Sequence, residues 1–401
     1  MSRIPSRTGR RRGIALAATT VVVGVLIGGP ANAATSVTAN PSTAPGGIVS
    51  SQKVEIPVTT GILGESAAYQ VRYRTVDNHD APVVTTTTIL KSSVPWLGSG
   101  PRPLLSYQFA EDGLSTACAP SALATSGTPA LAVDGVDITL ALAQGWTVAI
   151  PDYEGPASEF LGAHGEPREV LDGVRAAQGF APGGASSSSP VGLWGYSGGA
   201  FATALAAQIQ TSYAPELAIA GVATGGLPGD LSAAFPLLSG TGASADILFL
   251  IAGLERAYPE EHLEQYLSTA AQQVVDANSS SCITGATGPS FATLSSLEAY
   301  PGALTTGSFP SWARSISPLG QAGAPAAPLY DYHGLLDEIA PLSADRQTAL
   351  RYCAAGSPVE HVELPAEHET AQILGGPFAL VFLSGRFAGL PTTSNCSSIA
   401  G

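Results

Sequence analysis

The sequence predicts an α/β fold, in which helices cover both faces of a mainly parallel sheet and a mostly helical cap is inserted. Three observations predict it. Stretches with a strand pattern and stretches with a helical pattern follow one another over residues 68–226 and again over 327–387. This alternation is lost between about 227 and 324. A serine between two glycines follows an apolar stretch and precedes an alanine-rich one, which is the pattern of a sharp strand-to-helix turn.

Composition narrows the class of protein and of partner. The 401 residues are 45% hydrophobic and only 12% charged, which indicates a globular chain with a large core. The formal net charge of −14 argues against a nucleic-acid partner, because that affinity depends on Lys and Arg at phosphates. The same charge disfavours electrostatic attachment to anionic membranes.

The N-terminal residues 1–34 form a predicted signal peptide. Basic residues precede an apolar stretch over residues 14–29, and Ala31-Asn32-Ala33 matches a cleavage signal, so we expect cleavage near Ala33/Ala34 and a secreted protein. The apolar stretch is short for a membrane span, and we expect none in the mature chain. Sec and Tat export remain open. Residues 35–51 follow as a polar leader, expected to be poorly ordered.

The first part of the predicted core covers residues 52–226. Alternation with Tyr69, Val71, Tyr73 and Thr75 on one face predicts a strand over 68–76. Further strands are expected over 83–90, 103–109, 147–150 and 217–223, and helices over 136–144 and 166–178. A Gly- and Ser-rich linker over 182–190 leads to the apolar stretch 191–196.

The turn after that stretch carries the motif Gly195-Tyr196-Ser197-Gly198-Gly199, a G-x-S-x-G nucleophile elbow. Small neighbours are needed because the turn is tight, and a helix is expected to begin at about Gly198. The free backbone N–H groups of that helix end lie close to the serine. We interpret Ser197 as a nucleophile. The alternative is an ordinary glycine turn in a chain with 46 glycines.

The chain after residue 226 divides into two predicted parts. Residues 227–324 form the cap, with an apolar helix over 245–257 and an acidic amphipathic helix over 259–277. The core resumes over 325–401, with strands over 327–332 and 359–364 and helices over 344–355 and 370–387.

A serine hydroxyl needs a neighbouring base to act as a nucleophile. Six histidines are present: His79, His164, His262, His333, His361 and His368. In the α/β-hydrolases that carry this elbow, the order along the chain is serine, acid, histidine, which removes the first two. His262 lies on a charged helix of the cap and His361 inside a strand pattern. His368 lies in a loop just after that strand, where a base reaches the serine, and we assign it this role.

The acid is expected in the loop after the preceding strand. Asp337 lies there, and Glu338 and Asp331 are its competitors, although Asp331 falls within the strand. The chain has no H-E-x-x-H motif and no paired cysteine spacing, so neither a metal nor another cofactor is expected. The four cysteines of a secreted chain predict two disulfides, whose pairing the spacing leaves open.

Several motifs together make the chain resemble the secretory lipase family of the Candida antarctica lipase A type and its actinobacterial branch. The matching segments are Ser106–Asp112, Cys118–Ser121, Asp152–Gly155, Leu171–Ala176, Gly195–Ala200, Ser212–Leu217, His333–Pro341 and Ala366–His368. The resemblance implies an α/β-hydrolase fold, hydrolysis of triacylglycerols or other esters, and the triad Ser197, Asp337 and His368. It also implies an oxyanion hole of Asp112 and the Gly198 N–H, and the disulfides Cys118–Cys282 and Cys353–Cys396.

The oxyanion role of Asp112 carries a chemical condition. An ionised carboxylate donates no hydrogen bond, so Asp112 must be protonated, with a pKa well above the usual value of about 3.9. The alternative is an ionised Asp112 that only orders its loop through backbone N–H groups. We favour the protonated donor.

The sequence therefore predicts a secreted serine ester hydrolase, most simply a lipase that acts on lipid or ester substrates. The alternatives are an esterase or acyltransferase for short-chain or cell-envelope esters, a peptidase, and a non-catalytic binding protein on the same fold. Residues Ile247 to Ile251 are consecutively apolar, and we expect some of them, Phe249 above all, to face the acyl chain. A helix buried on all sides is the alternative.

Overall fold

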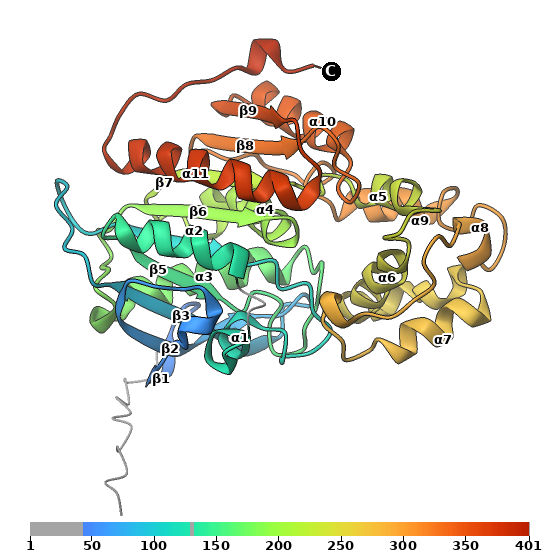
Figure 1. Ribbon diagram of the computed structural model, residues 1–401, viewed down its shortest axis with the longest axis horizontal. Coiled ribbons are helices and arrows are strands. Elements are labelled where there is room, and N and C mark those ends of the chain that lie inside the picture. The colour runs from blue at the N-terminus through green and yellow to red at the C-terminus, as the bar shows by residue number, and fades with distance from the viewer. Residues whose placement is uncertain (1–42, 129–131, 401) are drawn as a thin grey trace, which may run out of the picture. The chain divides into compact units, whose positions relative to one another are not determined.

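The computed structural model describes residues 43–128 and 132–400. The predicted signal peptide and the first part of the leader, residues 35–42, lie outside the described residues. Figure 1 shows a sheet with helices on both faces and a further group of helices beside it.

One nine-stranded sheet organises the core, in the order β1-β2-β3-β5-β4-β6-β7-β8-β9. The strands are β1 (Ile48–Val54), β2 (Glu65–Val76), β3 (Pro82–Ser92), β4 (Leu104–Gln108), β5 (Thr147–Pro151), β6 (Val191–Tyr196), β7 (Ile219–Gly225), β8 (Leu329–Gly334) and β9 (Val359–Leu364). Strands β1, β2, β3 and β5 pair antiparallel, and all pairings from β5 to β9 are parallel. The prediction of a mainly parallel sheet is confirmed.

The helices of the described residues fall into two groups. Those beside the sheet are α1 (Pro120–Ser126), α2 (Ala132–Ala143), α3 (Gly165–Gly179), α4 (Gly198–Tyr213), α10 (Leu342–Ala354) and α11 (His368–Phe387). Those between β7 and β8 are α5 (Leu231–Leu238), α6 (Ala245–Ala257), α7 (Thr269–Ala277), α8 (Leu294–Leu297) and α9 (Ser308–Ser315). The break in the strand–helix alternation, which the sequence places at 227–324, corresponds to this second group.

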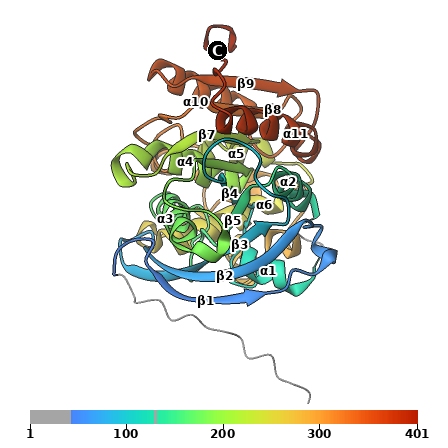
Figure 2. The ribbon, with the colours of Figure 1, turned by 90° about the vertical axis from the view of Figure 1, so that its left-hand side faces the viewer.

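Two apolar layers lie on opposite faces of the sheet, as Figure 2 shows for α2 and α11 on one side and α3 and α4 on the other. The strand side chains alternate between these layers because neighbours along a strand point to opposite faces. Leu193 packs with the α3 and α4 residues, whereas Trp194 packs with those of α2 and α11. Both faces of β6 are therefore buried, which explains why its sequence is apolar rather than alternating.

The helices between β7 and β8 have an apolar cluster of their own, built mainly from α5, α6, α7 and α9. Figure 1 shows α6 to α9 at the right-hand side of the sheet. Two disulfides tie chain segments together. Cys118–Cys282 joins the segment after β4 to this helical region, and Cys353–Cys396 joins α10 to the C-terminal segment. These are the pairs that the resemblance implies.

Several local predictions are wrong. Strand β1 begins at Ile48, inside the stretch expected to be a poorly ordered leader, because it pairs antiparallel with β2. The single acidic helix expected over 259–277 is broken, since His262 has a left-handed backbone with φ of 49°. Two short 3-10 helices precede α7, which Ser268 caps through the Ala271 N–H. Within the described ranges no helix is long and apolar enough to cross a bilayer.

Candidate active site

The nucleophile elbow stands where β6 meets α4. Ser197 has φ of 52° and ψ of −121°, a strained backbone for a residue with a side chain. A Cβ at Gly195 would lie 2.2 Å from the Gly199 carbonyl oxygen, and one at Gly199 would lie 2.0 Å from the Gln108 carbonyl oxygen. Both positions therefore require glycine. The tight turn therefore places Ser197 between the last residue of β6 and the first residue of α4.

His368 is the first residue of α11 and reaches this serine from the loop after β9. Its Nε2 lies 2.9 Å from Ser197 Oγ, and its Nδ1 lies 2.7 Å from Asp337 Oδ2. The Glu367 side chain caps the helix by accepting from the Thr370 N–H, which fixes where α11 begins. The three residues proposed for the triad thus form one hydrogen-bonded chain, and the imidazole is 3% exposed.

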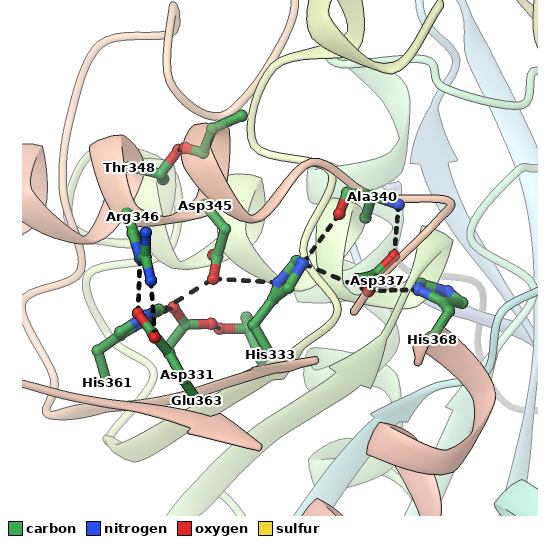
Figure 3. A network of polar contacts seen from close by, with 12 residues as sticks. Asp331, His333, Asp337, Ala340, Asp345, Arg346, Thr348, His361, Glu363 and His368 are labelled. Carbon is green, nitrogen blue, oxygen red and sulfur yellow. Dashed lines mark hydrogen bonds and ion pairs between the residues drawn. The ribbon is translucent and has the colours of Figure 1, made fainter. Parts of the chain in front are cut away.

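Asp337 lies in the loop after β8 and is held from several directions. Its Oδ1 accepts from the backbone N–H groups of Ile339 (3.0 Å) and Ala340 (2.7 Å). Burial raises the pKa of Asp337, but the hydrogen bond and charge of His368, the charge of His333 and the backbone donor outweigh it, so the pKa lies below its usual value. The lowered pKa favours an ionised Asp337 beside the imidazole. Figure 3 shows its carboxylate in contact with His368.

The competing residues lie elsewhere. Glu338 accepts from the backbone N–H of His368 at 3.2 Å through Oε2, and so contacts the chain rather than the ring. Asp331 pairs instead with His361, whose Nδ1 lies 2.9 Å from its Oδ2 on the neighbouring strand. The side chain of His262 is 72% exposed.

Asp112 lies over the start of α4. A Cβ on Gly198 would be only 1.9 Å from Asp112 Oδ1, so that oxygen touches the glycine directly. The segment is held in place, because the Ile283 N–H donates to the Asp112 carbonyl oxygen at 3.0 Å and Gly113 bridges to Cys282. The Cys118–Cys282 disulfide reinforces the same junction.

The electrostatics of Asp112 differ from those of Asp337. Its side chain is 8% exposed, and Oδ1 has no hydrogen-bond partner in the structure. Burial raises the pKa of Asp112 to about 7, against the opposing charge of His368, and nearby acidic groups add to the rise. As the first residue of α4, Gly198 has an N–H without a partner inside the helix. Protonated Asp112 and this N–H can both donate to an oxygen beside Ser197.

A narrow, mostly apolar cavity of about 60 Å³ opens beside Ser197. Its walls are Asp112, Phe160, Leu161, Gly198, Pro228, Leu231, Ala234, Leu238, Asp246, Leu250, Ile283, Ile339 and Ala340. Phe249, the residue expected at the acyl chain, is fully buried and packs against Phe160 in the helical cluster. The side chain at this cavity is that of its neighbour Leu250, because α6 turns Phe249 towards the interior.

In the part of the chain that the structure describes, a single group of side chains approaches the arrangement of a metal site. Asp331, Asp345 and His361 offer ligand atoms within 4.8 Å of one another. Closed metal sites usually have four ligands, and here the His361 ring and the Asp331 carboxylate already pair directly. The group is explained as a buried ion-pair network.

Two contacts of the site escape the sequence analysis. The Tyr196 hydroxyl donates to the His368 carbonyl oxygen at 2.5 Å and so ties α11 to the elbow. His333 lies 3.3 Å from Asp337 Oδ2 through its Nε2, behind the triad. The signal for His333 is its position at the end of a strand four residues before the acid.

Comparisons with known proteins identify the family and the fold. Residues 120–395 match the model of the secretory lipase family. The chain is 33% identical to a probable inactive lipase of Mycobacterium tuberculosis, with 88% of this chain and 80% of the relative covered. It is 31% identical to lipase A of Arthroderma benhamiae, with 89% and 79% covered. The crystal structure of Candida antarctica lipase A superimposes with a TM-score of 0.78 at 28% identity, covering 89% of this chain and 86% of that one.

Proposed function

The chain belongs to the secretory lipase family and is a carboxylic ester hydrolase, and we propose that Ser197 is its nucleophile and acylglycerols are its substrates. The observation that carries this proposal is the continuous chain from Ser197 Oγ through His368 to Asp337, with contacts of 2.9 and 2.7 Å. One relative is named probable inactive, but this chain holds all three side chains in contact.

The geometry gives each residue a step. His368 Nε2 takes the proton of Ser197 as its oxygen attacks the ester carbonyl, and Asp337 stabilises the imidazolium that forms. The carbonyl oxygen becomes negative and accepts from the Gly198 N–H and from protonated Asp112. His368 then gives its proton to the departing alcohol, which leaves an acyl group on Ser197. Water attacks this acyl-enzyme with the same base and releases the acid.

The apolar cavity favours an acyl chain as the group held next to Ser197. Leu231, Leu238 and Leu250 line it. Its polar side chains are those of Ser197, Asp112 and Asp246. A lipid ester fits this lining, with its carbonyl beside Ser197 and Asp112 and its hydrocarbon chain against the apolar side chains. An esterase for short-chain esters is the second candidate, supported by the small volume of about 60 Å³.

The test compares Ser197→Ala with Ser212→Ala, a matched change at an exposed serine of the same helix. Ser197→Ala is expected to lose about 10⁴-fold or more in ester hydrolysis, whereas Ser212→Ala keeps wild-type activity. A fluorophosphonate probe should label the wild type and Ser212→Ala only. Ser197→Ala with a tenth of the wild-type rate would overturn the assignment of the nucleophile.

Substrate class is decided by a hydrolysis profile over p-nitrophenyl esters of increasing chain length, together with one emulsified triacylglycerol. A lipase hydrolyses the emulsion and the longer esters, and a short-chain esterase does neither. Membership of a secretory family and the two disulfides agree with an extracellular protein. We propose cleavage near Ala33/Ala34, which N-terminal sequencing of the exported chain tests.

A further inference from the structure

A second buried histidine stands directly behind the triad. His333 is the fifth residue of β8, and its side chain is fully buried. Its Nε2 lies 3.0 Å from the Ala340 carbonyl oxygen and 3.3 Å from Asp337 Oδ2. Its Nδ1 lies 3.1 Å from Asp345 Oδ2 on α10. Figure 3 shows the imidazole between the two carboxylates.

The neighbours of the ring fix its protonation. A carbonyl oxygen only accepts, so Nε2 must carry a hydrogen. Nδ1 lies 3.1 Å from a carboxylate oxygen of Asp345, and a bare nitrogen lone pair would be repelled there. Neither Nδ1 nor the Asp345 carboxylate has a hydrogen-bond partner, so the contact between them is an ion pair rather than a hydrogen bond. Both nitrogens therefore carry hydrogens, and His333 is a buried imidazolium.

The surrounding charges agree with this assignment. Burial lowers the pKa of His333, but the carboxylates of Asp345 and Asp337 outweigh it and raise the pKa to about 9. The charged groups further out are His368 beyond Asp337, and Asp331, His361 and Glu363 beyond Asp345. With Asp337 and Asp345 as its direct neighbours, His333 keeps its proton over the neutral pH range.

His333 also fixes the loop that carries the acid. It holds the Ala340 carbonyl oxygen, while the Ala340 N–H donates to Asp337 Oδ1 at 2.7 Å. The His333 ring, Ala340 and Asp337 thus each contact the other two. Asp337 Oδ2 is shared between two imidazoles, with His368 Nδ1 at 2.7 Å on one side and His333 Nε2 on the other.

We propose that His333 is a positioning residue of the active site, a permanent cation that orients Asp337 and reduces the negative charge that His368 experiences. This inference rests on the proposed function of Ser197, His368 and Asp337. A cation behind the acid makes imidazolium formation at His368 less favourable, so the base is free at lower pH than it would be beside an uncompensated carboxylate. The His333 cation also reduces the stabilisation that Asp337 gives to the His368 imidazolium in the transition state. In return, it holds Asp337 in a fixed orientation.

The chain provides a matched control in His361. It is also buried, it also pairs with a carboxylate, and its pKa is likewise raised to about 9 by Asp331 and other acids against the effect of burial. Its ring contacts Asp331, Asp345 and Glu363, and none of these ion pairs involves Asp337. Comparing the two histidines therefore separates loss of a buried ion pair from loss of the contact to Asp337.

The experiment measures kcat and KM for a soluble p-nitrophenyl ester over a range of pH. In His333→Gln the acid limb of kcat/KM should move up by about one pH unit, because the uncompensated Asp337 favours protonated His368. Its kcat should fall about 10-fold, with KM changed less than about two-fold. His361→Gln should keep the wild-type acid limb, even where its melting temperature is lower. An active His333→Gln protein with the wild-type pH profile, or equal shifts in both variants, would overturn the inference.

A second measurement covers the case that His333→Gln does not fold. In the full chain with ¹⁵N-labelled histidine, the wild type at pH 8 should show imidazoles with hydrogens on both ring nitrogens. One doubly protonated imidazole, that of His333, should remain in His361→Gln. Loss of every such signal in His361→Gln overturns the inference. If the wild type does not hydrolyse esters, or if Ser197→Ala stays active, the proposed function is overturned instead.

Discussion

Asp112 can act in the oxyanion hole only while it carries a proton. Burial raises its pKa from 3.8 to about 7. This shift corresponds to about 4 kcal/mol against the ionised form, at about 1.4 kcal/mol per pH unit. At pH 5 nearly every molecule has the donor, whereas at pH 8 about one in ten has it. The activity of the wild type should therefore fall on the alkaline side, about 10-fold per unit well above pH 7.

Two substitutions separate the donor from its charge. Asp112→Asn keeps a hydrogen-bond donor of the same shape at every pH, so it should retain much of kcat and lose the alkaline limb. Asp112→Leu keeps the shape without the donor and should lose about 10²–10³-fold in kcat. Steady-state hydrolysis of a soluble ester from pH 5 to 9 measures both effects, and circular dichroism checks that each variant is folded. Equal losses in the two variants, with pH profiles like that of the wild type, would refute the donor role.

Three further outcomes follow from the buried acids, the cavity and the disulfides. Burial raises the pKa of several carboxyl groups, to about 8 for Asp137. Such a group contributes fully to the stability of the fold below its unfolded pKa of about 4. It loses this contribution as the pH rises through its folded pKa. The melting temperature should therefore fall between pH 5 and 9, and less so in Asp137→Asn; a curve that rises over this range contradicts the reasoning. Leu250→Phe should reduce hydrolysis of long esters more than of acetate, whereas Phe249→Leu should change stability and leave the chain-length profile alone. Replacing Cys118 and Cys282 by serine should lower kcat as well as the melting temperature, because the bond anchors the Asp112 segment, whereas loss of the C-terminal disulfide should lower only the melting temperature.

Local periodicity explains why the sheet is predictable from the sequence. Helix α6 and strand β9 have the predicted bounds, and the elbow has its motif in five consecutive residues. The proposed triad residues, which lie in contact, could be chosen because chain order and strand ends restrict the choice of acid and base. These signals need no knowledge of what packs across the sheet, since each depends on neighbours along the chain.

Other features depend on contacts between distant segments, and the sequence has no signal for them. The five consecutive apolar residues of α6 point to all sides of the helix. The sequence therefore does not indicate that Leu250 rather than Phe249 lines the cavity. The break at His262 is a left-handed backbone inside an otherwise helical pattern. The role of His333 requires Asp345 of α10 to fold against β8, twelve residues further along the chain.

The proposed mechanism requires the same side chain in two protonation states, neutral at Asp112 and ionised at Asp337. Both are buried, so desolvation alone would make both neutral. Asp337 receives two backbone N–H groups and two imidazoles, and these keep it ionised as the partner of His368. Asp112 Oδ1 receives no donor, and the pKa of this side chain is raised to about 7, which favours the protonated form that the proposed donor role requires. The number of donors around each carboxylate, rather than its depth, therefore decides which of the two carries negative charge through the reaction.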